Sequence, residues 1–209
     1  MAGRLALATQ QSSTVTSLPD HSDRRSNHRK GRLKEIVHQK AILHGDFILS
    51  SGLPSSYYFD GKMVTHDPEG LSLIGSLIFD AIKDQGIQGV GGLTMGADPI
   101  AAATALVSHL RGQPIPAFTV RREAKQHGTR KMVEGQLPPK GARVAIVDDV
   151  ITTGYSVLKA IEAAEAEGCV VAKVIVVVDR QQGGAQEIRK RGYPFEALLT
   201  ADDQGNVRA

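Results

Sequence analysis

Two adjacent carboxylates that follow an apolar run are the residues of this sequence best suited to do chemistry. Residues 144–157 read VAIVDDVITTGYSV, and the β-branched run predicts a strand that ends at Asp148 and Asp149. Residues 152–154, Thr-Thr-Gly, predict a turn into a helix that starts near residues 155–156. Unpaired backbone N–H groups and the helix dipole make such a helix start suitable for an anion. The sequence therefore places two negative charges beside a turn that is suited to bind a further anion.

The ligand of such a site must separate its own anion from the two carboxylates. Sugar hydroxyls donate hydrogen bonds to carboxylates, and Mg²⁺ bridges anions. A ribose 5-phosphate carries both a phosphate and a vicinal diol, so it satisfies both halves of the pattern. A Walker A loop is excluded because the run contains no Gly-Lys-Ser/Thr. The alternative is an acidic pair that ends a strand and caps a helix, without any ligand.

The run resembles the phosphoribosyl diphosphate (PRPP) signature of the type I phosphoribosyltransferases, and further segments narrow the likeness to the orotate phosphoribosyltransferase family. The resemblance implies that Asp148 and Asp149 are catalytic and hold the ribose hydroxyls, directly or through Mg²⁺. It also implies PRPP binding by the whole signature: Asp148, Asp149, Val150, Ile151, Thr152, Thr153, Gly154, Tyr155 and Ser156.

A charged segment at residues 120–128, VRREAKQHG, forms a poor core and a plausible mobile loop. It is similar to the catalytic loop of the same family, although Arg122 stands where lysine is commoner. The resemblance implies that Arg121, Arg122, Lys125 and His127 contact the diphosphate. Lys125 and His127, both counted as catalytic, would reach the site of a neighbouring subunit, which implies a homodimer. A charged face exposed to solvent is the alternative.

Two segments resemble those with which the family binds the base. In residues 45–62, GDFILSSGLPSSYYFDGK, the resemblance places Tyr58 and Phe59 against the orotate ring and Lys62 nearby. Core packing is the alternative for the aromatic pair. Many members have a lysine before Ser-Gly, where this chain has Ser50, so that contact does not carry over.

A strand that ends in Asp-Arg supplies a group for the carboxylate of the base. In residues 176–184, VVVDRQQGG, the resemblance assigns the carboxylate to Arg180, whose planar fork suits bidentate binding. A surface arginine is the alternative. Thr152 joins the orotate contacts. Residues 92–101, GLTMGADPIA, match a segment whose backbone lies beside the diphosphate and the base, with Gly96 allowing close approach.

The reaction implied is transfer of the 5-phosphoribosyl group from PRPP to orotate, which gives orotidine 5′-monophosphate and diphosphate in pyrimidine biosynthesis. Mg²⁺ is the implied cofactor, bound mainly through PRPP, with no side chain assigned as a direct ligand. A phosphoribosyltransferase for another base would share residues 148–156 but would not need Arg180. A PRPP-sensing regulator on the same fold would not need the charged loop.

Short apolar runs alternate with helical patterns along the chain. Asp67-Pro68 and Asp98-Pro99 each predict a helix start with an aspartate N-cap, and apolar spacing predicts a helix from about residue 31 to Gly45. The alternation predicts an α/β fold with a mainly parallel central sheet flanked by helices. The resemblance adds the type I phosphoribosyltransferase fold, with a small hood from the N-terminal hairpin and the C-terminal segment.

Composition predicts a disordered basic extension at residues 1–30 and one domain at residues 31–209. Residues 1–35 contain seven basic and three acidic residues, a balance of +4. The whole chain has a net charge of +3, so residues 36–209 carry −1. A nearly neutral domain argues against a nucleic-acid partner. Cys169 is the only cysteine, which favours a reducing, cytoplasmic setting. No apolar run is long enough to cross a bilayer, so no membrane partner is expected.

Overall fold

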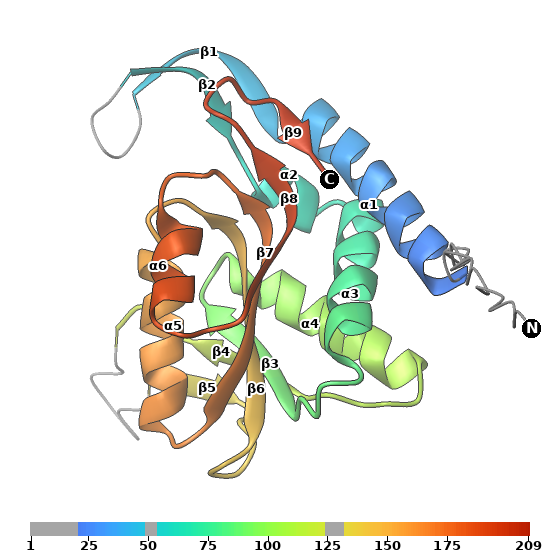
Figure 1. The fold of residues 1–209 in the computed structure, drawn as a ribbon, viewed down its shortest axis with the longest axis vertical. Helices are drawn as coiled ribbons and strands as arrows, with labels where there is room; N and C mark the ends of the chain where they lie inside the picture. Colours follow the sequence, from blue (N-terminus) through green and yellow to red (C-terminus); the bar gives the residue numbers. More distant parts are fainter. Residues whose placement is uncertain (1–20, 49–53, 124–131) are drawn as a thin grey trace, which may run out of the picture.

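A twisted central sheet with helices on both faces forms the body of the protein (Figure 1). The structure is a computed structural model that describes residues 21–48, 54–123 and 132–209. Its seven-stranded sheet has the order β5-β4-β3-β6-β7-β8-β9. The strands are β3 (Gly89–Leu93), β4 (Ala117–Val120), β5 (Val133–Gly135), β6 (Arg143–Ile151), β7 (Val170–Asp179), β8 (Phe195–Ala201) and β9 (Val207–Arg208). The predicted α/β architecture is confirmed.

The interior strands are parallel and buried on both faces. Neighbours among β4, β3, β6, β7 and β8 pair in parallel, whereas β5 and β9 pair antiparallel at the two edges. Along β6, Val144 and Ile146 belong to one hydrophobic cluster, and Ala145 and Val147 belong to the other. This alternation explains the continuous apolar run in the sequence.

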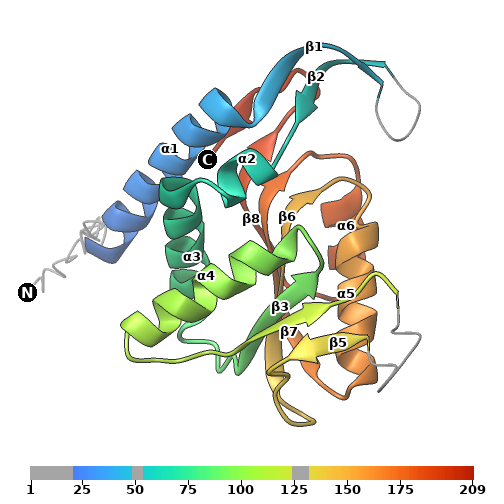
Figure 2. The same ribbon diagram turned by 180° about the vertical axis from the view of Figure 1, so that it is seen from behind.

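Two layers of helices cover these two faces. Figures 1 and 2 show α5 (Tyr155–Ala166) and α6 (Gly184–Lys190) on one side of the sheet, with α3 (Pro68–Ile82) and α4 (Ala97–Leu110) on the other. The long helix α1 (His21–Lys40) packs on α3. Among the described residues, no helix combines the length and apolar character needed to cross a membrane. Because β3, β6 and β7 are parallel neighbours, their carboxyl ends lie together at the same end of the sheet.

A hairpin lies over this end of the sheet and forms the predicted hood (Figures 1 and 2). It consists of β1 (Ile42–Ile48) and β2 (Pro54–Phe59), and the short helix α2 (Lys62–Thr65) returns the chain to the body. The Tyr57 hydroxyl in β2 donates a hydrogen bond to the Asp202 carbonyl, 2.9 Å away, in the turn between β8 and β9. The hairpin and the C-terminal segment therefore form one cap, which confirms the hood.

The first helix differs from the prediction at both ends. It begins at His21, ten residues before the expected boundary, and ends at Lys40, so that Ile42 opens β1. Composition suggested disorder up to residue 30, but Arg29 pairs with Asp80 of α3 at 2.6 Å and Lys30 lies 3.6 Å from Glu196 of β8. The basic segment is thus part of the helix, and two of its side chains contact residues distant in the sequence. The remainder of the predicted extension, residues 1–20, lies outside the described residues.

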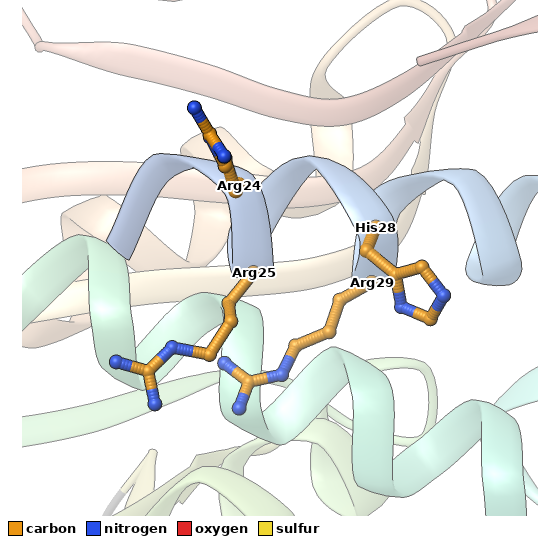
Figure 3. Close-up of a pocket in the computed structure, with 4 residues that line it drawn as sticks. All are labelled: Arg24, Arg25, His28 and Arg29. Carbon is orange, nitrogen blue, oxygen red and sulfur yellow. The ribbon is translucent and has the colours of Figure 1, made fainter. Parts of the chain in front are cut away.

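The side chains on this helix are divided between the body and the solvent. Figure 3 shows Arg25 and Arg29 pointing toward α3, which carries Asp80, whereas Arg24 and His28 point away from α3. These four residues line a hollow of about 480 Å³. A neighbouring hollow also contains Asp80 and Glu196, the partners of Arg29 and Lys30, so acids of the body match part of its positive charge.

Burial, more than charge pairing, should anchor α1. Leu33 is fully buried in the core between α1 and α3, whereas the ion pair of Arg32 with Glu69 is exposed. Leu33→Ala is expected to lower the free energy of unfolding by about 2–5 kcal/mol because it leaves a cavity. Arg32→Ala should have a much smaller effect, since exposed charge pairs contribute little. Denaturant unfolding of both variants would measure this, and equal losses would contradict it.

Candidate active site

A polar cleft lies where β3 and β6 end. It has a volume of about 130 Å³, and ten residues from four segments line it: Lys62, Leu93, Thr94, Met95, Gly96, Arg122, Asp148, Asp149, Val150 and Ser156. A smaller hollow of about 50 Å³ continues it along residues 150–157, and the two hollows share Asp148, Val150 and Ser156. The fold thus brings the predicted carboxylates, the predicted anion turn, Lys62 and Arg122 together.

The two carboxylates are held in place by backbone contacts. Asp148 is only 5% exposed, and its Oδ1 accepts a hydrogen bond from the Asp149 backbone N–H at 3.0 Å. The Asp149 Oδ1 accepts in the same way from the Val150 backbone N–H at 2.9 Å. Because each bond uses an atom next to the carboxylate in the chain, both groups have a fixed orientation before any ligand arrives.

Two glycines pack directly against this pair. A methyl group on Gly96 would lie 2.6 Å from Asp149 Oδ1 and 2.8 Å from Asp148 Oδ1, and one on Gly61 would lie 2.8 Å from Asp149 Oδ2. Heavy atoms cannot approach so closely, so a side chain at either position would force one or both carboxylates to move. The sequence pointed to Gly96 as a site of close approach, but nothing in it singled out Gly61.

Burial and the neighbouring charge of Asp149 raise the pKa of Asp148 well above its ordinary value. Since its unfolded pKa is about 3.9, the folded state binds more protons than the unfolded state between that value and the raised one. Stability therefore falls as pH rises through this window. At pH 7 the buried carboxyl of Asp148 therefore contributes less to stability than it does at low pH.

Replacing this carboxyl by its neutral isostere should consequently stabilise the protein. Asp148→Asn keeps the oxygen that accepts from Asp149 and removes the buried ionisable group, so its melting temperature should exceed that of the unaltered protein at pH 7. The difference should shrink as the pH falls toward 4. Thermal unfolding from pH 4 to 8 measures it, with the exposed Asp84→Asn as control. A variant less stable at pH 7 would contradict the interpretation.

The predicted anion turn has the geometry for that role. Gly154 takes a left-handed conformation, with φ of 91°, at the N-cap of α5, where no described side chain caps the helix. A methyl group there would lie 3.4 Å from Gly184 of the neighbouring turn. The first residues of α5, together with Thr152 and Thr153, thus line one small hollow, at a helix start whose N–H groups suit an anion.

Asp98 does not have the predicted role of a helix cap. The N-cap of α4 is Gly96, and the Asp98 carboxylate accepts instead from the hydroxyls of Thr94, at 2.6 Å, and Thr119, at 3.0 Å. This carboxylate joins the loop after β3 to strand β4. The Asp-Pro pattern could not reveal the contact with Thr119, because that residue of β4 is brought there by the fold. The equivalent prediction for Asp67 is confirmed, since its side chain accepts from the Gly70 N–H at 2.8 Å.

The described ends of the charged loop lie beside the cleft. The Arg121 N–H donates to the Met132 carbonyl at 2.8 Å and its guanidinium pairs with Glu134 at 3.0 Å. The Nε of Arg122 donates to the Thr94 carbonyl at 3.2 Å. Arg122 therefore lines the cleft, whereas Arg121 is paired with β5. Lys125 and His127 lie outside the described residues.

The predicted base contacts are dispersed. Lys62 lines the cleft, but Phe59 is 8% exposed in the hydrophobic core, as the core-packing alternative has it. Tyr58 is 41% exposed, and its ring centre lies 5.7 Å from that of Phe47. Arg180 is buried at the end of β7 and is hydrogen bonded to the Tyr57 hydroxyl. Tyr57 was not among the predicted residues.

Metal binding in the described residues would depend on the ligand as well as the protein. No group of three or more His, Cys, Asp or Glu side chains gathers in this part of the chain. Asp148 and Asp149 nevertheless present hard carboxylate oxygens at the cleft, which is the donor type that Mg²⁺ prefers. The donor set fits an ion that shares its coordination with a bound phosphate ligand.

Comparison with known proteins agrees with this geometry. The family model of the phosphoribosyl transferase domain matches residues 60–204. The orotate phosphoribosyltransferase of Nostoc sp. strain PCC 7120 is 47% identical over 172 residues, which cover 82% of this chain and 83% of the relative. The chain belongs to the orotate phosphoribosyltransferase family. The enzyme of that name from Aquifex aeolicus is 45% identical and matches 80% of this chain and 93% of its own.

Solved structures of family members share the fold. Orotate phosphoribosyltransferase of Mycobacterium tuberculosis in complex with PRPP superposes with a TM-score of 0.70 at 35% identity, covering 82% of this chain and 96% of that one. Adenine phosphoribosyltransferase of Leishmania donovani, 17% identical with a TM-score of 0.58 over 80% of this chain and 79% of its own, shares the fold alone. The family is thus shown by the sequence matches, and the fold is shared with the solved structures.

Proposed function

We propose that the protein transfers the 5-phosphoribosyl group of PRPP to orotate, yielding orotidine 5′-monophosphate and diphosphate. The observation that carries the proposal is the cleft in which two fixed carboxylates adjoin the uncapped start of α5. A ligand with a diol and a phosphate matches both parts. The structure of a relative with bound PRPP supports the same ligand here.

In this proposal the 5-phosphate binds the turn at residues 152–156 and the ribose hydroxyls donate to Asp148 and Asp149. The diphosphate lies toward the Thr94–Gly96 loop and Arg122, which line the same cleft. Val150 and Ile151 complete the wall of the phosphate hollow. The substrate is thereby held at three points, and the bond between C1 and the diphosphate has a fixed position.

The chemistry then demands charge stabilisation more than proton transfer. Cleavage of the bond at C1 builds positive charge on the ribose and negative charge on the departing diphosphate, as in glycoside chemistry. Arg122 and the cations of loop 120–128 stabilise the leaving group. Orotate is already an anion, so its nitrogen attacks without a strong base. When bound with PRPP, Mg²⁺ supplies further neutralisation of the diphosphate.

Three further properties belong to the proposal. The orotate-binding residues in this proposal are Lys62, Thr152, Tyr58, Phe59 and Arg180. Phe59 would need to leave the hydrophobic core to contact orotate. The protein is a homodimer in which Lys125 and His127 serve the neighbouring subunit. It works in the cytoplasm, which suits a chain with a single cysteine.

The experiment that tests the proposal is orotate consumption by the purified protein, followed by ultraviolet absorbance with PRPP and Mg²⁺. Loss of orotate that requires both PRPP and Mg²⁺, with no turnover of uracil or hypoxanthine, is the expected result. Turnover of another base would assign a different phosphoribosyltransferase. Binding of PRPP without turnover of any base would assign the PRPP-sensing regulator.

A further inference from the structure

The guanidinium of Arg180 is largely buried and contains one buried donor atom, Nε, without a hydrogen-bond partner among the described residues. Arg180 follows the last residue of β7, is 7% exposed, and its Nε has no hydrogen-bond partner in the described part of the chain. An unpaired donor on a buried charged group is costly. The orientation of this guanidinium therefore depends on the contacts that surround it.

Tyr57 holds this guanidinium in two ways. Its hydroxyl accepts a hydrogen bond from Arg180 Nη2, and the guanidinium carbon lies 4.6 Å from the centre of its ring. The second distance is within the range of a cation–π contact. Tyr57 is itself only 1% exposed, so its ring is fixed by packing.

The Tyr57 hydroxyl has a defined polarity because both of its hydrogen bonds are made. It accepts from Arg180 and donates to the Asp202 carbonyl at 2.9 Å. Burial raises the pKa of Tyr57, which keeps the phenol neutral and able to donate. The charge of Arg180 acts in the opposite direction on that pKa but is outweighed.

The acceptor of this chain of hydrogen bonds is also rigid. The Asp202 carboxylate accepts from the backbone N–H groups of Gln204 and Asn206, at 3.0 and 2.9 Å, which closes the turn between β8 and β9. Gly205 of that turn packs against the Tyr57 ring, since a methyl group on it would lie 3.3 Å from Tyr57 Cδ2. Tyr57 therefore joins β2, the end of β7 and the C-terminal turn.

We propose that Tyr57 is a positioning residue that holds Arg180 in the orientation required to bind the carboxylate of the pyrimidine ligand. The inference deepens the proposed function and depends on it. It assigns the preference for a carboxylated base to a pair of residues, Arg180 and Tyr57, and makes the C-terminal turn part of the base site. Tyr57 itself touches no substrate in this account.

The test compares the binding of two nucleotides that differ only in the carboxylate, orotidine 5′-monophosphate and uridine 5′-monophosphate. Tyr57→Phe keeps the ring and removes the hydroxyl. The Kd for orotidine 5′-monophosphate should rise about tenfold or more, as expected for losing a hydrogen bond to a charged group, whereas the Kd for uridine 5′-monophosphate should change less than about threefold. In turnover, the KM for orotate should rise and the KM for PRPP should not.

Tyr193→Phe is the matched control. Its hydroxyl donates to Glu165 at 2.9 Å on the surface, so this variant loses a tyrosine hydrogen bond far from the cleft. It should leave both Kd values unchanged. Circular dichroism at the temperature of the titration checks that each variant is folded.

Arg180→Lys is the second variant, because lysine cannot reproduce the planar contact with the ring. It should lose the same preference, and the double variant should bind orotidine 5′-monophosphate no more weakly than Arg180→Lys alone. Additive losses would mean that Tyr57 acts independently of Arg180 and would overturn the inference, as would an unchanged preference in Tyr57→Phe. If the unaltered protein showed no preference for the carboxylated nucleotide, the proposed function would fail first, together with the inference.

Discussion

Gly96→Ala should remove nearly all phosphoribosyl transfer. The added methyl group would lie within 2.8 Å of a carboxylate oxygen of both Asp148 and Asp149, so one or both side chains must leave their positions. If each loses a hydrogen bond from a ribose hydroxyl, at about 1.5–3 kcal/mol per bond to a charged group, kcat/KM should fall by about 10²–10⁴-fold. Initial rates of orotate consumption measure the loss of kcat/KM, and calorimetric titration measures the weaker binding of PRPP.

The loss should come from the contact of the methyl group with the carboxylates and not from the change of glycine to alanine as such. Gly31 offers a matched control because it lies inside α1 with nothing within 4 Å of an added methyl group. Gly31→Ala should leave turnover unchanged and raise stability by about 0.5–1 kcal/mol. Turnover of Gly61→Ala should lie between those of the other two variants, because its methyl group would approach the carboxylate of Asp149 but not that of Asp148. Turnover of Gly96→Ala within tenfold of the unaltered protein would show that the carboxylates do not need their present positions.

The elements that carry the site could be predicted from the sequence because their patterns are local. The apolar run before Asp148 is continuous since β6 is buried on both faces, and the glycine at residue 154 marks the left-handed turn into α5. A strand end and the following helix start are adjacent in the chain. Their relative position therefore depends little on the rest of the fold.

Other features depend on partners distant in sequence, and no local pattern reveals them. Asp98 binds Thr119, and Arg29 binds Asp80, only after the sheet and α3 have formed. Strand β5 has three residues, too few for a periodic signal, and its pairing with β4 defines it.

The hairpin shows a different limit of sequence reasoning. Tyr57, Tyr58 and Phe59 are all aromatic, so an alternating pattern cannot say which of them faces inward. In the structure Tyr57 and Phe59 are buried and Tyr58 is partly exposed, which is the period of a strand. The resemblance to the family drew attention to residues 58 and 59. The residue that holds Arg180 is their neighbour, and only its contacts identify it.

Lys125→Ala should lower kcat by about 10²–10³-fold, the effect of removing one preorganised group that stabilises transition-state charge. The loop that contains it connects the paired strands β4 and β5, and its first residues include Arg122, which lines the cleft and reaches the Thr94 carbonyl. The Kd for PRPP should change less than about tenfold, since the turn and the carboxylates remain. Single-turnover rates and PRPP titration measure the two effects, with the exposed Lys190→Ala as control. Unchanged turnover would remove the loop from the mechanism.

A mixing experiment distinguishes whether Lys125 serves its own subunit or the neighbouring one. Lys125→Ala and Asp149→Asn each inactivate the enzyme, but in a dimer of one of each, a shared loop leaves one site with both native residues. Half of randomly re-formed dimers are mixed, so about a quarter of the original activity should return. If Lys125 acts within its own subunit, each chain of the mixed dimer keeps its own defect and no activity returns. Recovery would therefore establish that the dimer itself forms the catalytic unit.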